Sequence, residues 1–220
     1  MSVLTPPVSG FDLNVPVLIV GAGACGLVAA LAATDAGADV LVIEADATPS
    51  GSTALSAGLI PAAGTRFQRD AGIEDSTDLF ANDIQNKAKG ENPQDLVDLL
   101  ASASGPVIEW LADRFDLPFS VVTDFDYPGH SRRRMHGLPT RAGRELIDRL
   151  RTACEAQGID IICNRRATAL FVDGDIIQGV RLDGPTGTED IGCGALVLAC
   201  NGYGGNRDMV RKFMPEIENA

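Results

Sequence analysis

Residues 15–45, VPVLIVGAGACGLVAALAATDAGADVLVIEA, decide the fold. A short apolar run breaks at a glycine-rich turn, 21–26, and small helix-forming residues then continue to Gly37, a residue type that commonly ends helices. A second apolar run follows and ends at Glu44. The order strand, glycine turn, helix, strand and acid predicts a dinucleotide-binding βαβ unit.

Each glycine of the turn has a different physical task. Gly21 permits the tight turn, Gly23 lets a pyrophosphate approach the backbone, and Gly26 allows the helix to pack closely on the sheet. The helix N-terminus offers unpaired N–H groups and a partial positive charge to phosphates. Glu44 would accept hydrogen bonds from ribose hydroxyls and repel a 2′-phosphate, which favours FAD or NAD over NADP. The alternative is a glycine turn without a ligand.

Composition restricts the class of protein. A chain of 220 residues with 45% hydrophobic content can hold one large domain or two small ones. The net charge of −12 argues against binding to nucleic acid or to a membrane surface. The N-terminus has no basic region and apolar segment like those of secretory signals. Five cysteines form no CxxC pair and no metal-ligand spacing, so we expect no metal and a cytoplasmic protein with reduced thiols.

The segment after Glu44, residues 45–60, is rich in small residues, hydroxyls and glycines. It could be a flexible linker. Its position at the carboxyl end of the second strand favours a second loop around a cofactor, because ligands of open α/β sheets bind there. Ser52 and Thr53 would donate to phosphate oxygens, and backbone N–H groups around Gly58 could face a flavin ring.

Four segments together resemble the FAD-binding flavoproteins of the fumarate reductase and succinate dehydrogenase group, which includes 3-ketosteroid dehydrogenases. The segments are GAGACG at 21–26, VIEA at 42–45, SGSTALSAG at 50–58 and ALVLACNGYGGN at 195–206. The resemblance covers residues 15–212 and implies an α/β, Rossmann-like FAD-binding domain. In that domain a parallel sheet is flanked by helices and interrupted by a small antiparallel β-meander.

The resemblance also implies the cofactor contacts. Members that bind flavin covalently carry a histidine about where Ser52 stands, so this sequence implies non-covalent FAD. Cys200 and Asn201 replace the usual Thr-Gly, and asparagine tolerates the left-handed conformation that a turn there needs. The residues expected to bind FAD are Gly21, Gly23, Ala24, Cys25, Gly26, Glu44, Ala45, Gly51, Ser52, Thr53, Ala57, Gly58, Leu59, Ala167, Ala199, Cys200, Asn201 and Gly202.

The pattern of apolar residues predicts the remaining elements. A helix is expected from Asp75 or Ser76 to Lys89, and another after an Asn92 cap with proline first. Leucines and other apolar residues of the second helix fall at helical spacing, and its tryptophan is expected to pack against helices. A third helix should run to Gly158. Strands at 159–163, 168–172, 176–181, 188–193 and 195–199 are expected, with an Asp-Gly hairpin turn at 173–174.

Residues 118–144 reverse the charge of the chain, because they hold five arginines and both histidines. One interpretation is a solvated loop whose arginines pair with neighbouring carboxylates. The other, supported by the family resemblance, is that this segment lines the flavin–substrate cleft and that arginine binds a carboxylate substrate. The candidate catalytic residues are Arg134 and His136, followed by Tyr127.

The resemblance therefore implies an FAD-dependent oxidoreductase that transfers hydride between flavin N5 and a carbon next to a carbonyl or carboxylate. Its partner would be a small-molecule substrate such as a carboxylate or enone. We expect residues 1–14 to be a flexible leader and residues 15–220 to form an incomplete FAD-binding domain, with the family's capping domain and C-terminal FAD segment absent. Alternatives are a non-catalytic nucleotide-binding remnant, a subunit completed by a partner chain, and an NAD-dependent dehydrogenase.

Overall fold

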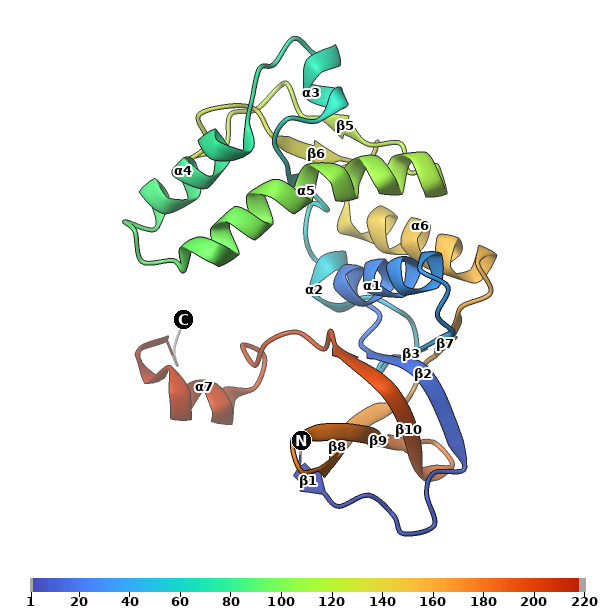
Figure 1. Cartoon of the computed structure of the whole chain (residues 1–220). Helices are drawn as coiled ribbons and strands as arrows, with labels where there is room; N and C mark the ends of the chain where they lie inside the picture. The colour runs from blue at the N-terminus through green and yellow to red at the C-terminus, as the bar shows by residue number, and fades with distance from the viewer. Residues whose placement is uncertain (1, 218–220) are drawn as a thin grey trace. The chain divides into compact units, whose positions relative to one another are not determined.

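A computed structural model describes residues 2–217 of the chain and divides it into two compact parts. Unit 1 comprises residues 1–52 and 150–220, and unit 2 comprises residues 53–149. Figure 1 shows the helices and strands with the labels used below. Within the described residues, no helix is long and apolar enough to cross a membrane.

Unit 1 is built on a seven-stranded mixed sheet with the order β1-β8-β9-β10-β2-β3-β7. Its strands are β1 Ser2–Leu4, β2 Leu13–Val20, β3 Val40–Ile43, β7 Asp160–Ile162, β8 Arg166–Asp173, β9 Ile176–Gly184 and β10 Gly187–Leu198. Strands β10, β2, β3 and β7 run parallel to one another, and β8, β9 and β10 form an antiparallel meander. This is the predicted fold class.

Helix α1, Ala24–Asp35, covers one face of this sheet, as Figure 1 shows. It follows β2 directly and buries Gly26, Leu27, Ala30 and Leu31, which lie on one side of a helix because of its 3.6-residue repeat. Strands β2, β3, β9 and β10 contribute a cluster of buried apolar residues to the core of unit 1: Leu18, Leu41, Ile43, Val180, Leu182, Ile191 and Cys193. Full burial of one such Leu or Ile side chain contributes about 1.5–3 kcal/mol. The predicted βαβ unit is therefore present as β2-α1-β3.

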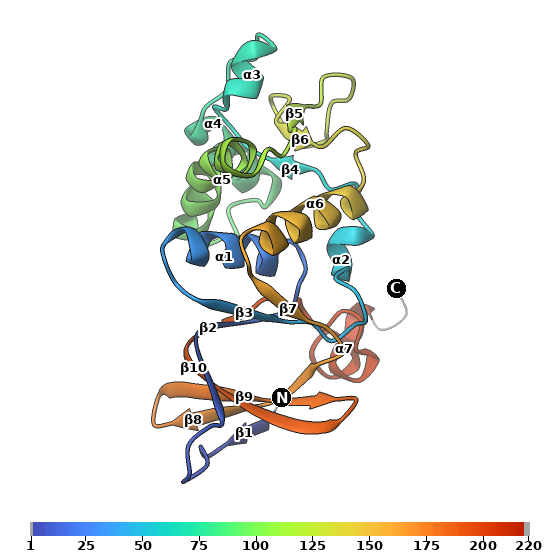
Figure 2. The same ribbon diagram turned by 90° about the vertical axis from the view of Figure 1, so that its right-hand side faces the viewer.

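The meander contains the predicted hairpin, in which Gly174 has a φ of 56° between β8 and β9 (Figure 2). The expectation of two strands at 188–193 and 195–199 is wrong, because β10 is one continuous strand. Its first half pairs with β9 and its second half with β2, and Ile191 and Gly192 pair with both. The strand continues through Gly194. A Cβ added at this position would lie 3.0 Å from the carbonyl oxygen of Pro16.

Part of the expected leader belongs to the sheet. Ser2–Leu4 form β1 and pair in parallel with residues 169–171 of β8, and β2 already begins at Leu13. Three residues are too few to show the alternation that identifies a strand in sequence. The remaining elements of unit 1 are α7, Arg207–Phe213, and the short 3-10 helix η1, Pro215–Ile217.

Unit 2 consists of helices and a three-stranded sheet with the order β4-β6-β5. Its elements are β4 Ile60–Pro61, α3 Arg66–Asp70, α4 Thr77–Lys87, α5 Gln94–Phe115, β5 Ser120–Val121 and β6 Met135–Gly137. Two further helices, α2 Gly51–Ala54 and α6 Gly143–Ala156, span the boundaries between the units. The predicted helices are all present, although Pro93 rather than Asn92 precedes α5 as its N-cap residue.

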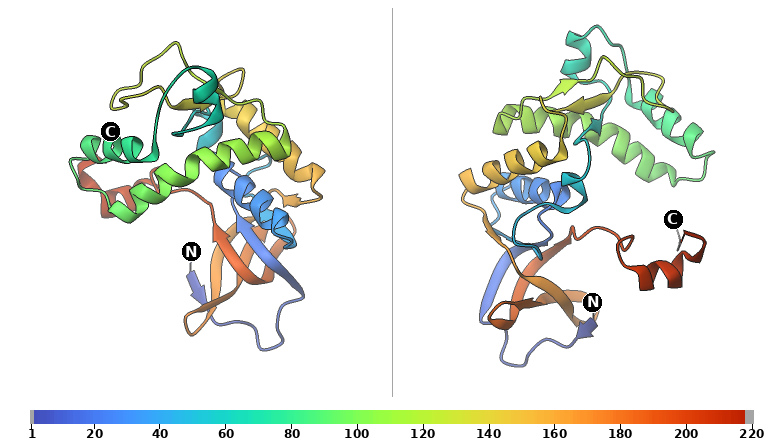
Figure 3. Two further views of the ribbon diagram at one scale, coloured as in Figure 1. Left: turned by 45° about the horizontal axis from the view of Figure 1, so that its top comes forward. Right: turned by 180° about the vertical axis from the view of Figure 1, so that it is seen from behind.

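Helices α4 and α5 lie side by side in unit 2 (Figure 3). Ser76 begins α4, as expected, because its Oγ accepts a hydrogen bond from the Leu79 N–H at 3.2 Å. Between the two helices lies a buried cluster made of Ala63, Phe80, Ala81, Val97 and Ala101, with Ile84 packed against it.

Candidate functional site

The glycine turn after β2 has no space for a side chain at Gly21 or at Gly26. A Cβ on Gly21 would lie 2.5 Å from the carbonyl oxygen of Ala199, and Gly21 has a φ of 106°, which L-amino acids avoid. A Cβ on Gly26 would lie 1.8 Å from the Gly21 carbonyl oxygen. Glycine is therefore required at both positions, as predicted from the sequence.

Helix α1 begins immediately after this turn, with Gly23 as its N-cap residue in an extended conformation. Gly23 has no side chain that could cap the helix, and the first turn of α1 contains no acidic residue. The first-turn N–H groups of a helix have no partner within the helix and carry the positive end of its dipole. The arrangement fits a phosphate group.

Glu44 is fixed beside the glycine turn. Its carboxylate is buried, Oε2 accepts from the Ala22 N–H at 2.8 Å, and Oε1 accepts from the Asp46 N–H at 2.9 Å. A carboxylate oxygen can accept about two hydrogen bonds, so ribose hydroxyls can share these oxygens. The position suits the ribose contact expected from the sequence.

Two more loops meet the glycine turn within unit 1. Asn201 donates a short hydrogen bond from Nδ2 to Ser52 Oγ, and a Cβ on Gly51 would lie 3.9 Å from the Gly23 Cα. Asn201 has a φ of 66°, the left-handed conformation expected for it, and its Oδ1 accepts from the Gly202 N–H at 2.9 Å. Residues 21–26, 51–52 and 199–202 therefore converge at the carboxyl ends of β2, β3 and β10.

The other expected cofactor contacts are distributed over both units. Ala45, Ala167 and Cys200 belong to unit 1, where Ala167 pairs with Leu182 beside an irregularity in the β8–β9 ladder. Thr53, Ala57, Gly58 and Leu59 belong to unit 2. Gly58 has a φ of 62°, and a Cβ there would lie 3.0 Å from the backbone of Gly143, so its glycine is also required. A cofactor contact of these unit 2 residues stays a prediction.

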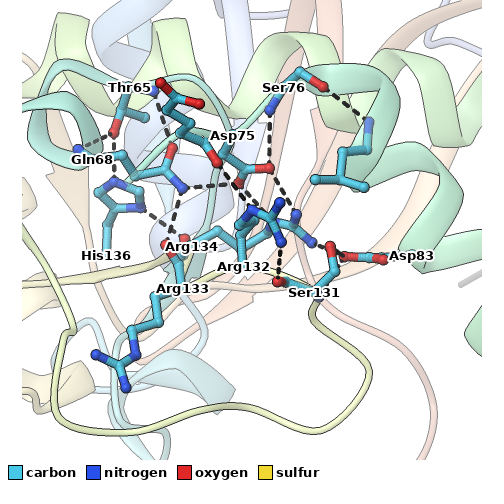
Figure 4. Close-up of polar contacts among 12 residues, drawn as sticks. Thr65, Gln68, Asp75, Ser76, Asp83, Ser131, Arg132, Arg133, Arg134 and His136 are labelled. Atoms are coloured by element: carbon cyan, nitrogen blue, oxygen red, sulfur yellow. Dashed lines mark hydrogen bonds and ion pairs between the residues drawn. The ribbon is translucent and has the colours of Figure 1, made fainter. Parts of the chain in front are cut away.

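Arg134 is fully buried in unit 2 between two carboxylates (Figure 4). Its Nε and Nη2 donate to Asp75 at 2.9 and 2.8 Å, and its Nη1 donates to Asp83. The guanidinium carbon also lies 4.8 Å from the centre of the Phe80 ring. Burial lowers the pKa of Arg134, but the hydrogen bonds and charges of the two aspartates outweigh it and raise the pKa above its usual value.

His136 is held in the same buried cluster, which Figure 4 shows. Nδ1 lies 2.8 Å from the Arg134 carbonyl oxygen and Nε2 lies 2.8 Å from Thr65 Oγ1. Burial lowers the pKa of His136, so the ring is neutral. Because a carbonyl only accepts, Nδ1 carries the proton and Nε2 accepts from the Thr65 hydroxyl. Thr65 Oγ1 in turn accepts from the Gln68 N–H at 3.1 Å.

Several arginines of residues 118–144 are therefore paired with carboxylates of the same chain, some buried and some at the surface. Besides Arg134, Arg133 pairs with Asp126 and Arg141 with Asp124 at the surface. Sequence reasoning missed Asp75 and Asp83 as partners of Arg134, because 59 and 51 residues separate them along the chain. These contacts give Arg134 and His136 a structural role. A catalytic role for either residue is not tested by this geometry and stays a prediction.

Tyr127 lines a small cavity together with Arg134 and Met135. Its ring packs edge-on against Phe125 at 4.7 Å and borders a surface cavity of about 610 Å³ in unit 2. The cavity is lined by Gly72, Ile73, Glu74, Asp126, Tyr127, His130, Ser131, Arg132 and Arg133. Among the residues described, no group of three or more His, Cys, Asp or Glu side chains could hold a metal ion.

Comparison with known proteins shows what the chain is similar to. Residues 16–220 match the family model described as an FAD binding domain. The chain is 35% identical to a probable fumarate reductase of Shewanella frigidimarina, over 92% of this chain and 35% of that protein. It is 30% identical to a urocanate reductase of Eggerthella lenta, over 95% of this chain and 35% of that protein. The chain thus spans about a third of the length of these relatives.

Solved structures show the same fold. The open conformation of a flavocytochrome c3 fumarate reductase superposes with a TM-score of 0.88 at 33% identity, covering 96% of this chain and 38% of that one. A 3-ketosteroid-Δ4-(5α)-dehydrogenase from Rhodococcus jostii gives a TM-score of 0.81 at 21% identity, covering 98% of this chain and 52% of that one. The second likeness bears on the fold alone.

Proposed function

The chain belongs to the family of FAD binding domains, and we propose that it holds FAD non-covalently through the three loops of unit 1, in the service of an oxidoreductase reaction. The observation that supports this most is the convergence of the glycine turn, the Glu44 carboxylate and the Ser52–Asn201 pair at one edge of the sheet. The proposal assigns the glycine turn and the Ser52–Asn201 pair to the diphosphate and Glu44 to the ribose.

In this proposal, the parts of unit 1 have separate tasks. The first turn of α1 binds the diphosphate, together with the Ser52 hydroxyl, because N–H and O–H donors and the helix dipole favour anions. Glu44 accepts from the ribose hydroxyls. The backbone around Ala167 faces the adenine, and residues 199–202, which follow β10, form the remaining side of the site. Bound flavin supplies hydride chemistry at its N5 atom.

Non-covalent binding rests on the chemistry of Ser52. A covalent link to flavin in this family uses a histidine at about this position, whereas Ser52 offers a hydroxyl that accepts from Asn201 Nδ2. Acid precipitation of the FAD-loaded protein tests this part of the proposal. All of the yellow colour should appear in the supernatant, and flavin retained in the washed precipitate would contradict it.

The substrate class comes from the relatives. Two of the relatives reduce, by their names, fumarate and urocanate, so we propose reduction or oxidation of a carbon–carbon bond next to a carboxylate or carbonyl. The decisive assay supplies the full chain with FAD, a reduced dye and fumarate or urocanate, and follows dye oxidation. Turnover that requires both FAD and substrate supports the proposal. Dye oxidation that proceeds at the same rate without fumarate or urocanate would contradict it.

A second candidate function is FAD binding without turnover, in a subunit that a partner chain completes. One observation favours it: Arg134 and His136, the first candidates for catalysis, are held in buried structural contacts of unit 2. This candidate predicts that FAD binds and that dye oxidation with either substrate stays at the background rate. A cytoplasmic location belongs to both candidates as an expectation from the five unpaired cysteines.

A further inference from the structure

The surface cavity of about 610 Å³ in unit 2 is large enough for a small molecule. Pockets that bind small ligands usually measure about 300–1,000 Å³. Its wall comes from two segments, within residues 72–74 after α3 and within residues 126–133 before β6. All of these residues belong to unit 2, so the cavity is formed within one compact part of the chain. We call it the unit 2 cavity.

Both walls of the unit 2 cavity are held by buried contacts. Asp75 and Arg134, which directly follow the two wall segments, form the buried ion pair described above. Ser131 donates from its N–H and its Oγ to Asp83, at 2.7 and 2.8 Å, and Asp83 also accepts from Arg134 (Figure 4). The walls are therefore fixed before a ligand arrives, which lowers the entropy cost of binding.

Arg132 joins the two walls and keeps an uncompensated charge. Its Nε donates to the Glu74 carbonyl oxygen at 3.1 Å, and its Nη1 donates to the Ser131 carbonyl oxygen at 2.8 Å. Both acceptors are backbone carbonyls, and within the part of the chain that the structure describes no carboxylate pairs with Arg132. The remaining N–H donors, which include both of Nη2, form a planar fork that suits a carboxylate.

The other titratable groups of the cavity leave one negative charge without a partner. Arg133 and Asp126 satisfy each other, because Nε and Nη2 of the arginine donate to the two carboxylate oxygens at 2.6 and 3.1 Å. Burial lowers the pKa of His130, so its ring is neutral. The Glu74 carboxylate is exposed, and among the described residues it has no hydrogen bond or ion pair, not even with the neighbouring Arg132.

The described residues of the cavity thus leave one cation and one anion without an ionic partner, which suits a ligand that carries both charges. A plain anion would be attracted by Arg132 and repelled by Glu74, and a plain cation would meet the reverse. An α-amino acid carries its carboxylate and its ammonium group on one carbon, so it can meet both side chains at once. Ile73 and the Tyr127 ring supply an apolar part of the wall.

We propose that the unit 2 cavity binds an α-amino acid with an apolar side chain. Arg132 holds the carboxylate of this ligand and Glu74 holds its ammonium group. The side chain of the ligand lies against Ile73 and Tyr127. The inference goes beyond the proposed function, since it concerns a second ligand and residues of unit 2 alone. Binding is measured without FAD, so its failure and the failure of FAD binding are separate results.

Related compounds that lack one charge test both contacts on the native chain. Isothermal titration calorimetry with the full chain should show saturable binding of L-phenylalanine and of L-leucine. Binding of 3-phenylpropanoate, which lacks the ammonium group, should be at least tenfold weaker than that of L-phenylalanine, because a hydrogen bond to a charged group is lost. Binding of 2-phenylethylamine, which lacks the carboxylate, should be at least tenfold weaker for the same reason.

Two variants assign each charge of the ligand to one side chain. Arg132→Gln should lower the L-phenylalanine affinity at least tenfold and remove its advantage over 2-phenylethylamine. Glu74→Gln should lower the L-phenylalanine affinity at least tenfold and remove its advantage over 3-phenylpropanoate. The matched controls Arg207→Gln and Glu91→Gln, which alter exposed charges outside the cavity, should leave the affinity unchanged.

Three results would overturn the proposal. The first is that the native chain shows no saturable binding of either amino acid. The second is equal binding of L-phenylalanine and of the two compounds that carry a single charge. The third is an unchanged L-phenylalanine affinity in Arg132→Gln or Glu74→Gln protein whose circular dichroism stays native. If a variant fails to fold, the comparison of the three compounds on the native chain still decides.

Discussion

Replacing Glu44 measures the ribose contact directly. In the substitution Glu44→Ala, the site loses the acceptor of up to two charge-assisted hydrogen bonds to the ribose. A hydrogen bond to a charged group is worth about 1.5–3 kcal/mol, and rearranged water offsets part of the loss, so we expect about 1–3 kcal/mol. This corresponds to roughly 5- to 150-fold weaker FAD binding.

Glu44→Ala also acts on the fold, because the carboxylate accepts from the Ala22 and Asp46 N–H groups. A buried N–H left without a partner costs about 1–3 kcal/mol. The assay must therefore separate the two effects. Urea unfolding gives the free energy of unfolding, and titration of the folded protein with FAD, followed by flavin fluorescence, gives the dissociation constant.

Two matched variants complete this experiment. Glu44→Gln keeps a carbonyl acceptor but removes the charge, so it should weaken FAD binding less than Glu44→Ala. Asp175→Asn removes an exposed carboxylate from the hairpin turn of unit 1 and should change neither quantity. An unchanged dissociation constant in folded Glu44→Ala protein would refute the ribose contact.

Three further predictions concern the glycine turn, the buried cluster and its pH dependence. Gly21→Ala forces a Cβ to 2.5 Å from the Ala199 carbonyl and should abolish FAD binding, whereas Gly174→Ala, whose Cβ would meet no atom within 4 Å, should leave the FAD affinity unchanged in the same titration. Arg134→Met leaves Asp75 and Asp83 without their buried cation and should lower the free energy of unfolding by about 3–5 kcal/mol in urea. Its control Arg133→Met breaks only an exposed pair and should unfold at nearly the native urea concentration; equal effects of the two would contradict the cluster. Burial lowers the pKa of His136 in the folded state, so the unfolded chain binds more protons near pH 6, and stability should fall as the pH drops below the usual histidine value of about 6.5. Urea unfolding at a series of pH values should show this loss, and a His136→Gln variant with the same pH slope as the native chain would exclude His136 as its source.

The sequence was sufficient for local features with short spacing. The turn at 21–26, the hairpin at Gly174 and the left-handed Asn201 each depend on the conformational range of one or two residues. The convergence of residues 51–52 on the same sheet edge was predictable as well, because carboxyl ends of parallel strands meet at one edge.

Features that depend on distant residues were not predictable. Arg134 finds Asp75 and Asp83 through the tertiary fold, and no sequence pattern marks that pairing. The continuity of β10 through Gly194 depends on its pairing with two different neighbours. Helical spacing identified Leu99 as part of a helix, but spacing alone does not reveal which side of the helix is buried.

Amide hydrogen exchange with and without FAD tests the central claim most directly, because it reports on each loop separately. We predict that FAD slows exchange at residues 21–26, 51–52 and 199–202, and that FMN, which lacks the adenosine, does not protect the turn at 21–26. Unchanged exchange at all three loops in the presence of saturating FAD would contradict the proposed site.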